Sequence, residues 1–209
     1  MLVSAWLPAS HGRYLAACKK PGTSLGVIYN PYCIWGVPDY VPEDQVAAIA
    51  DLLKPDAALR MSRRIQDINA GAGISRFSKA MVTEYALDGD GYYFAQGTEA
   101  DCFNRFEQYF AEEEWLVMPV WHPQYLRHAY KIRALDEPLG LLSGEDQATL
   151  IAASDVVEAT PKQPIEDLVS LRPGNAAISE LDFLIRHKKF SALEAADSWL
   201  ARQSEPTEA

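Results

Sequence analysis

The chain has 209 residues, 48% of them hydrophobic, which is enough to bury a core as one large domain or as two small lobes. Its 29 acidic and 19 basic residues give a formal net charge of −10, which repels phosphate backbones and excludes nucleic acid as a partner. The longest apolar runs, such as Trp115 to Trp121, fall far below the roughly 20 residues that a membrane-spanning helix needs.

Two β-rich stretches open the chain. Leu2 to Trp6 is a short apolar run closed by Pro8, which predicts a buried strand. Ser24 to Val37 is a longer stretch of strand-forming residues that is broken at Asn30-Pro31. Both stretches lie just ahead of segments with helical patterns.

Two helices are predicted next. Glu43 to Leu53 carries apolar residues at helical spacing behind an acidic first turn, which indicates an amphipathic surface helix. Gly71-Ala72-Gly73 then precedes an apolar stripe with 3-4-4 spacing, which predicts a helix from Ile74 to Tyr85 with the glycines at its N-terminus.

The middle of the chain alternates strand and helix. Tyr92 to Ala95 is a short predicted strand, and the capping-box pattern from Thr98 to Asp101 opens a predicted helix that runs through Phe110. Trp115 to Trp121 is predicted as a buried strand, whose Pro119 indicates an end or an irregularity and not a central ladder position.

The last third is predicted to be mostly helical after a strand from Tyr130 to Leu135. Capping-box patterns at Ser143–Asp146 and Ser191–Glu194 predict helix starts. Ile178, Leu181 and Ile185 stripe a helix between them, residues 159–164 form a predicted loop, and residues 204–209 form a frayed tail. Because strands alternate with helices, the chain is predicted to have an α/β fold.

The cysteines do not indicate a cross-linked or metal-bound protein. Cys18, Cys33 and Cys102 are odd in number and none belongs to a C-x-x-C pair, so no disulfide framework or zinc site is signalled. We read all three as small buried hydrophobic residues, and we predict neither a metal nor a cofactor.

Two tryptophans end apolar strands and stand next to prolines. Trp6 and Trp121 lie close to Pro8 and Pro123, at the strand ends where an open α/β sheet places its ligands. A tryptophan face attracts a cation, and several rings can surround a trimethylammonium group, which cannot donate hydrogen bonds. The alternative is that both rings are ordinary core residues.

Four spaced segments resemble the successive motifs of one protein family. They are Ala5 to Gly12, Val37 to Tyr40 with Ile49 to Leu52, Ile65 to Gly73, and Trp121 to Gln124 followed by Leu135 to Pro138. In this order they are similar to the substrate-binding proteins of glycine betaine and proline betaine ABC transporters. The resemblance covers nearly the whole chain.

The resemblance implies a two-lobed periplasmic-binding-protein fold of type II with a ligand cleft between the lobes. Trp6 and Trp121 match the tryptophans that stack on the ligand. The family often carries a histidine at the last position of Trp-x-Pro-x as a carboxylate donor, whereas this chain has Gln124 there and His122 directly after the tryptophan. The donor is therefore left open between them. We expect lobe 1 to comprise residues 1–24 and 121–209, and lobe 2 residues 25–120.

Further ligand-binding candidates come from the residues themselves. Gly71, Ala72 and Gly73 at a helix start can offer backbone N–H groups to an anion, or they can simply form a tight turn. His11 is a candidate carboxylate donor, with an exposed loop histidine as the alternative. The aromatic candidates for the wall of the cleft are Tyr93, Tyr32 and Trp35, each of which can equally be a packing residue.

An enzyme is the less favoured reading. Cys33 or Ser10 as nucleophile with His11 or His122 as base would suit acyl transfer. No G-x-S-x-G elbow or other nucleophile context surrounds these residues, so we predict that the chain is not an enzyme.

The predicted function is to bind a small quaternary-ammonium osmolyte as the receptor of an ABC importer, with a membrane permease as partner. The alternative is a cytoplasmic or fused sensing module of the same fold. The chain start lacks a signal-peptide pattern, so we expect a periplasmic or extracellular protein if a leader has been removed and a cytoplasmic one if Met1 is the native start. Because Trp6 lies so near the start, we expect the first lobe to be incomplete. The consequence is either weakened betaine binding or a homodimer in which a second chain supplies the missing surface.

Overall fold

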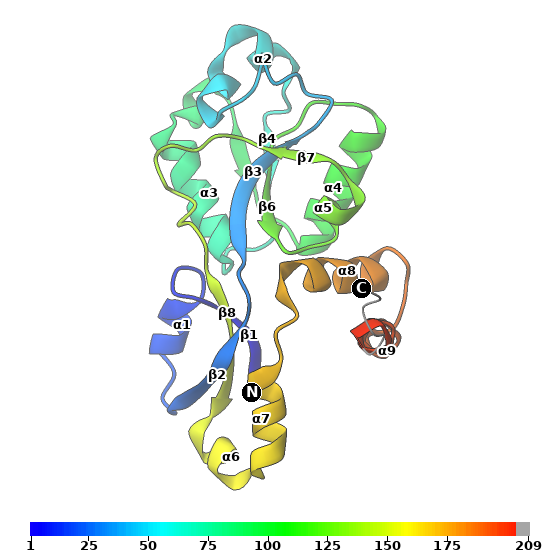
Figure 1. Cartoon of the computed structure of the whole chain (residues 1–209). Helices are drawn as coiled ribbons and strands as arrows, with labels where there is room; N and C mark the ends of the chain where they lie inside the picture. The colour runs from blue at the N-terminus through cyan, green and yellow to red at the C-terminus, as the bar shows by residue number, and fades with distance from the viewer. Residues whose placement is uncertain (204–209) are drawn as a thin grey trace.

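The computed structural model describes residues 1–203 and shows two lobes joined by two crossings of the chain (Figure 1). The strands are β1 (Leu2–Leu7), β2 (Gly22–Tyr29), β3 (Tyr32–Pro38), β4 (Arg64–Gln66), β5 (Tyr93–Ala95), β6 (Met118–His122), β7 (Ile132–Ala134) and β8 (Gln147–Ala153). The α-helices are α1 (Gly12–Ala16), α2 (Pro55–Arg60), α3 (Gly73–Glu84), α4 (Glu99–Ala111), α5 (Leu126–Ala129), α6 (Ser154–Ala159), α7 (Lys162–Ser170), α8 (Gly174–Arg186) and α9 (Ala192–Gln203). Two short 3₁₀ helices are η1 (Ile49–Leu53) and η2 (Leu87–Asp90).

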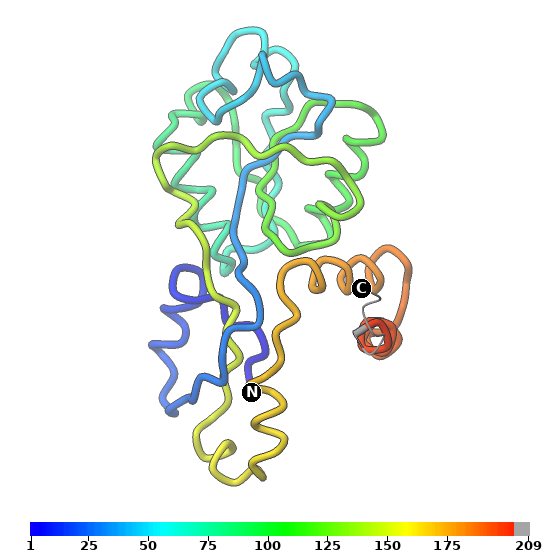
Figure 2. Tube along the Cα trace, in the orientation of Figure 1, coloured from blue at the N-terminus to red at the C-terminus, as the bar shows by residue number. Residues whose placement is uncertain are grey.

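Each lobe is built on its own antiparallel sheet. The sheet β1-β8-β2 with α1, α6 and α7 forms one lobe, which we name the β8 lobe. The sheet β6-β3-β7 with the parallel pair β4-β5 and helices α2 to α5 forms the other, which we name the β3 lobe. The trace in Figure 2 passes from one lobe to the other between β2 and β3, and returns between β7 and β8.

The crossings determine where the chain changes lobe. The first lies at Asn30-Pro31, where the break in the Ser24–Val37 stretch was predicted, because proline cannot donate a ladder hydrogen bond there. The predicted divisions after residues 24 and 120 fall inside β2 and β6, so the two sheets divide the chain later at both points. The strand pattern indicated the break but not that the sheet changes at it.

Most predicted elements are confirmed. Strands occur where the sequence predicts them near residues 2–7, 93–95, 118–122 and 132–134, and helices α3, α4, α8 and α9 lie where predicted. The capping box at Thr98 forms, since Thr98 Oγ1 accepts from Asp101 N–H at 3.2 Å and Asp101 Oδ2 accepts from Thr98 N–H at 2.8 Å. Pro119 lies in β6, an edge strand, as its irregularity indicates.

Three local predictions are wrong. Glu43 to Leu53 is not an α-helix: only η1 forms, because Val46 and Ile49 pack into the core in a turn. The capping box at Ser143–Asp146 opens no helix but precedes β8, since the Asp146 carboxylate accepts from Ala9 and Ser10 of another segment. The loop over 159–164 is shorter than predicted, with α7 already formed at Lys162. The predicted tail at 204–209 lies outside the described residues.

The two main sheets are antiparallel, which the alternation of strands and helices along the chain did not predict. β8 was not predicted as a strand, and it supplies the central ladder on which both β1 and β2 pair. β1 is an edge strand with Leu2 and Val3 more than half exposed. The predicted homodimer remains a prediction.

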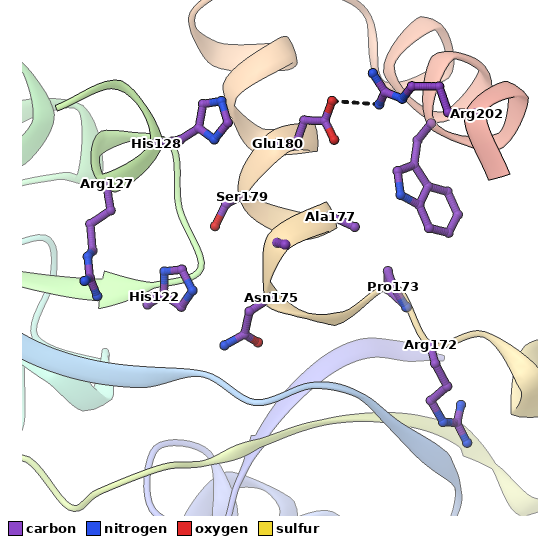
Figure 3. Close-up of a pocket in the computed structure, with 12 residues that line it drawn as sticks. His122, Arg127, His128, Arg172, Pro173, Asn175, Ala177, Ser179, Glu180 and Arg202 are labelled. Atoms are coloured by element: carbon purple, nitrogen blue, oxygen red, sulfur yellow. Dashed lines mark ion pairs between the residues drawn. The ribbon is translucent and has the colours of Figure 1, made fainter. Parts of the chain in front are cut away.

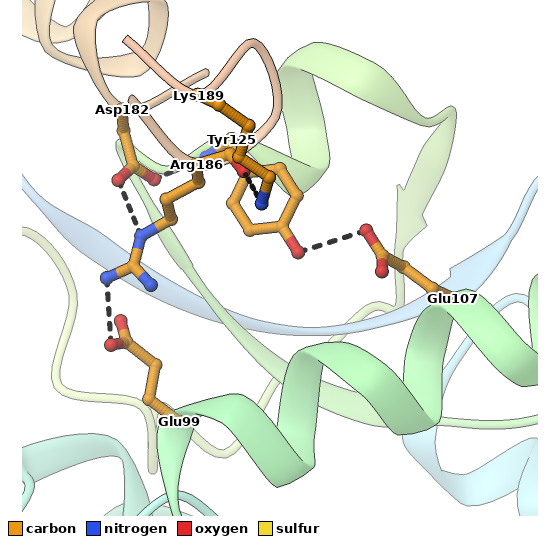
Figure 4. A network of polar contacts seen from close by, with 6 residues as sticks. All are labelled: Glu99, Glu107, Tyr125, Asp182, Arg186 and Lys189. Atoms are coloured by element: carbon orange, nitrogen blue, oxygen red, sulfur yellow. Dashed lines mark hydrogen bonds and ion pairs between the residues drawn. The ribbon is translucent and has the colours of Figure 1, made fainter. Parts of the chain in front are cut away.

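Helix α8 packs beside the β3 lobe and attaches to it through charged side chains, and α9 packs on α8 (Figures 1 and 4). Arg186 near the end of α8 pairs with Asp182 and with Glu99 of α4, each at 2.8 Å. Asp182 also accepts from the Tyr125 N–H at 2.8 Å, and Tyr125 donates its hydroxyl to Glu107 at 3.1 Å. This network fastens the C-terminal helices to the lobe opposite the β8 sheet from which they emerge.

Within residues 1–203, no helix is both long enough and apolar enough to cross a bilayer. The same part of the chain holds no group of three or more His, Cys, Asp or Glu side chains arranged to bind a metal ion.

Candidate functional site

A small cavity of about 170 Å³ lies where the loop after β1 meets the start of α3. Its wall is formed by Trp6, Ser10 and His11 of the β8 lobe and by Ile68, Ala72, Gly73, Ile74 and Trp121 of the β3 lobe. The volume is several times the ~30 Å³ of a water molecule and below the roughly 300–1,000 Å³ of drug-sized pockets, so it suits a small solute. Both predicted tryptophans and His11 therefore share one cavity between the lobes.

Trp6 is held by hydrogen bonds at its ring nitrogen. Its Nε1–H lies 3.0 Å from both Ser4 Oγ and Tyr29 OH, and those two hydroxyls also contact each other. The Tyr29 ring meets the indole edge at 90°. The half-buried indole is thereby fixed in one orientation toward the cavity.

His11 closes the turn that follows β1. The ring Nδ1 of His11 accepts from the Trp6 backbone N–H at 2.9 Å, and the His11 backbone N–H donates to the Trp6 carbonyl at 2.8 Å. Burial lowers the pKa of His11, and Arg76 adds to this effect while Asp146 opposes it. Since Nδ1 is an acceptor, we assign the proton of the neutral ring to Nε2, which makes Nε2 the atom available to donate to a ligand.

The two lobes approach each other closely at Gly73. A Cβ on this residue would lie 2.6 Å from Ser10 Oγ and 3.0 Å from Ser10 Cα, so only glycine fits against the opposite loop. Ser10 is itself held by its N–H donating to Asp146 at 3.1 Å, and Ala9 N–H donates to the same carboxylate at 2.7 Å. Gly73 is thus a contact between lobes as well as a part of the cavity wall.

The start of α3 offers fewer free N–H groups than the glycine motif predicts. The Gly71 and Ala72 N–H groups both donate to Asn69 Oδ1, at 3.0 and 3.1 Å. The N-cap residue Ala72 provides no side-chain cap, so the orphan donors of this helix begin at Gly73. Gly71 does not line the cavity, and its carbonyl accepts from Tyr14 OH at 2.7 Å across the lobes.

Trp121 enters the cavity from β6 and packs on the core of the β3 lobe. Its ring lies 5.5 Å from that of Phe103, centroid to centroid. On the neighbouring strand Cys33 is its register partner. Burial raises the pKa of the Cys33 thiol to about 12, and Asp146 adds to the shift, so the thiol is protonated at neutral pH and is no nucleophile.

The remaining predicted site residues lie elsewhere. Tyr93 is 54% exposed on β5, and Trp35 is fully buried with its Nε1–H donating to Ser78. Tyr32 stacks near His122, and His122 lines a different hollow beside α8. Gln124 is buried with neither amide atom hydrogen-bonded among the described residues, and it does not line the cavity.

Three cavity residues were not among the predicted ligand contacts. Ile68 and Ile74 flank the glycine motif and supply apolar wall, and Ser10 was considered only as a nucleophile. The helical stripe marked Ile74 as a core residue, which is the only signal that the sequence gives for it. Asp146, which fixes Ser10, is far away in sequence, and its local pattern predicted a helix start and not this contact.

The fold defines a class of protein: a two-lobed α/β solute receptor, here with a cavity between the lobes. The chain belongs to the family of the substrate binding domain of ABC-type glycine betaine transport systems, whose model matches residues 1–202. Members of this family bind solutes and catalyse no reaction, in agreement with the non-enzyme prediction.

Solved structures with the same fold support this assignment. The glycine betaine/L-proline-binding protein ProX of Borrelia burgdorferi is 20% identical, with a TM-score of 0.78 over 96% of this chain and 73% of that one. Lactococcal OpuAC in complex with glycine betaine is 19% identical, with a TM-score of 0.80 over 96% and 75%. A choline-binding protein in complex with choline is 16% identical, with a TM-score of 0.75 over 96% and 70%. No curated protein matches the chain by sequence.

These likenesses confirm the two-lobed type II periplasmic-binding-protein fold. The family places its members at the periplasmic or extracellular face of the membrane, as receptors of ABC importers.

Proposed function

We propose that the cavity between Trp6 and Trp121 binds a small quaternary-ammonium solute of the glycine betaine or choline type. The observation that carries the proposal is the pair of tryptophans, one from each lobe, on the wall of one 170 Å³ cavity. A trimethylammonium group gains roughly 0.5 to 2 kcal/mol from each desolvated ring face, while its methyl groups suit the apolar wall of Ile68 and Ile74.

The polar part of the wall suits a carboxylate at the other end of the solute. His11 Nε2–H and the uncapped N–H groups from Gly73 onward are the donors that the cavity offers. An anion at a helix N-terminus is favoured by the helix dipole. A betaine carries a quaternary ammonium and a carboxylate, so it uses both the aromatic and the polar part of the wall. Choline has no carboxylate and uses only the aromatic part.

We infer that the chain delivers its solute to an ABC permease from the outer face of the membrane. The lobes face each other across a small cavity and are joined by two chain crossings, at 30–31 and 135–146. Ligand-linked closure about these crossings is the motion that this architecture favours. The sensing-module alternative shares the binding site, and a pull-down of a permease by the ligand-loaded protein separates the two functions.

The test of the site is calorimetric titration of the chain with glycine betaine, proline betaine, choline and carnitine. Trp121→Ala and Trp6→Ala are each expected to weaken binding about tenfold or more, because each removes about 1–2 kcal/mol of ring–cation attraction. Trp199→Ala is the control, since Trp199 lies outside the cavity on α9. Wild-type affinity in both cavity variants would refute the site.

A further inference from the structure

A second and larger hollow lies on the other side of β6, between α5 and the C-terminal helices. Its volume is about 780 Å³, and Figure 3 shows its two walls. One wall carries His122, Arg127 and His128 from β6 and α5, and the other is formed by α8, the residues before it, and α9. None of the residues that line the cavity of Trp6 lines this hollow.

The hollow is basic in a chain whose net charge is −10. Three arginines line it against a single acidic residue, Glu180, which pairs with Arg202 at 2.7 Å. Within residues 1–203 the other two form no ion pair: Arg127 donates to the Tyr32 hydroxyl at 2.7 Å, and Arg172 donates to the Leu171 carbonyl at 2.7 Å. Two guanidinium groups without a carboxylate partner among the described residues therefore line the hollow.

The N-terminus of α8 faces the same space. This 13-residue helix begins at Gly174, and its N-cap residue Pro173 makes no side-chain hydrogen bond. Asn175 and the two alanines that follow it line the hollow. The first N–H groups of an uncapped helix and its dipole favour an anion at this end.

Buried polar atoms without partners supply an independent observation. Ser179 is only 6% exposed, and its Oγ has no hydrogen-bond partner among the described residues. His122 Nδ1, on the facing wall, is likewise buried without a partner. In Figure 3 the Ser179 hydroxyl points from α8 toward the wall that carries His122. A buried hydroxyl is costly unless it is hydrogen-bonded, so both atoms indicate a missing polar ligand.

We propose that this hollow is a binding site for a small soluble oxyanion, a phosphate or a carboxylate, separate from the solute cavity. Arg127 and Arg172 supply charge and fork-shaped donors, the start of α8 supplies backbone N–H groups, and the Ser179 hydroxyl and His122 complete the shell. Because α8 contacts both α5 and β2, an anion here lies where α8 links the two lobes.

The first test is titration of the full chain with inorganic phosphate and with citrate at constant ionic strength. Arg127→Gln is expected to weaken binding about tenfold. The chain offers a matched control in Arg105, which also donates to a tyrosine hydroxyl, at 3.2 Å, and lies 5.2 Å from that ring, compared with 5.6 Å for Arg127. Arg105→Gln removes the same charge on α4 and is expected to leave the affinity within twofold.

Each outcome decides the proposal. Saturable binding of either anion that is lost with Arg127→Gln and kept with Arg105→Gln supports it. No binding of either anion up to about 10 mM, or equal weakening in both variants, overturns it, because net charge alone would then explain the effect. Ser179→Ala, which changes neither charge nor volume greatly, is expected to weaken binding about threefold to tenfold. It keeps the test valid if Arg127→Gln fails to fold.

A second measurement separates this site from the solute cavity. Trp6→Ala is expected to leave phosphate or citrate affinity unchanged, since Trp6 does not line the basic hollow. Loss of anion binding in Trp6→Ala would mean that the anion enters the solute cavity and would overturn the second site.

Discussion

The two hollows beside β6 differ in chemistry although they share one strand. Trp121 opens onto the aromatic cavity and the next residue, His122, opens onto the basic hollow. Successive side chains of a strand point to opposite faces, so neighbouring residues can serve sites with opposite charge preferences. This alternation explains why His122, a predicted carboxylate donor next to Trp121, does not line the cavity that Trp121 lines.

The contacts that join the lobes also differ between the cavity side and the α8 side of the molecule. On the cavity side, Gly73 packs on Ser10 and Arg76 donates to the Ala9 carbonyl at 2.8 Å. The loop that receives both contacts is held within the β8 lobe by the Asp146 carboxylate, whose bond to the Ser10 N–H is buried. On the α8 side the contacts are partly exposed ion pairs, with Arg186 39% exposed. Buried hydrogen bonds to a charged group are worth more than exposed ion pairs, so the cavity side should dominate the energetics of the contact.

The largest effect is expected from Asp146→Ala. The change leaves two backbone N–H groups without their acceptor, one of them buried, and should lower the free energy of unfolding by about 2–4 kcal/mol. Urea denaturation measures it. Asp51→Ala is the matched control, because Asp51 also accepts from two N–H groups, of Ala47 and Ala48, but within one turn. Its loss should be about 1 kcal/mol, and an equal loss in both would contradict the dominance of the cavity side.

Gly73→Ala is expected to affect ligand binding next most strongly. The added Cβ would meet Ser10 at 2.6–3.0 Å, which forces the lobes apart at the cavity and should weaken quaternary-ammonium binding by about 1–2 kcal/mol, or tenfold and more. Calorimetric titration measures it. Gly12→Ala, whose Cβ would meet nothing within 4 Å, is the control on the opposite loop. Unchanged affinity in Gly73→Ala would show that this contact does not set the cavity.

The sequence predicts elements better than their partners. Local patterns located α3, α4, α8 and α9, because apolar spacing and caps depend on neighbouring residues. β8 was not predicted as a strand, because the capping pattern directly before it predicts a helix. The Asp146 carboxylate of that pattern instead accepts from the Ala9 N–H, 137 positions away in the chain. The antiparallel pairing of β1 with β8 could not be predicted from local patterns either, because strand order depends on residues far apart in the chain.

The sequence also indicated only some of the residues that line the candidate site. Trp6, His11, Ala72, Gly73 and Trp121 line one cavity, as the motifs indicated together. Tyr93 and His122 do not, because which face of a strand a side chain occupies depends on register, which spacing along one segment does not fix. The Asn69 side chain, which occupies the Gly71 and Ala72 N–H groups, could be anticipated only from the turn geometry.

On the α8 side, Arg186→Gln tests the weaker contact. Breaking the pairs with Asp182 and Glu99 should lower the free energy of unfolding by about 0.5–1 kcal/mol at low salt and by less at high salt, because the charges are partly exposed. Lys20→Gln, which removes an ion pair at 3.8 Å between side chains 81% and 70% exposed, should have no measurable effect. A loss in Arg186→Gln as large as that in Asp146→Ala would reverse the ranking of the two sides.

The last effect concerns the dependence of stability on pH and involves His11. Burial lowers the pKa of His11 below its usual 6.5, and burial followed by Arg127 does the same for His122. As the pH falls through 6.5, the unfolded chain takes up protons that the folded chain refuses, so the free energy of unfolding must decrease with falling pH. One such group contributes at most about 1.4 kcal/mol per pH unit to this slope.

The variant that isolates His11 is His11→Asn, whose Oδ1 can accept the Trp6 N–H in place of Nδ1 but does not titrate. Unfolding measured between pH 7.5 and 5.5 should show a smaller decrease in stability for His11→Asn than for the wild type, with the remainder due to His122 and the carboxylates. At pH 7.5 the two proteins should be nearly equal in stability, because the neutral imidazole and the amide make the same hydrogen bond. The same slope in both proteins would mean that His11 takes up its proton as easily in the folded state as in the unfolded one. The imidazole would then not be the neutral donor that the cavity requires, and the carboxylate of a betaine would have to rely on the N-terminus of α3 alone.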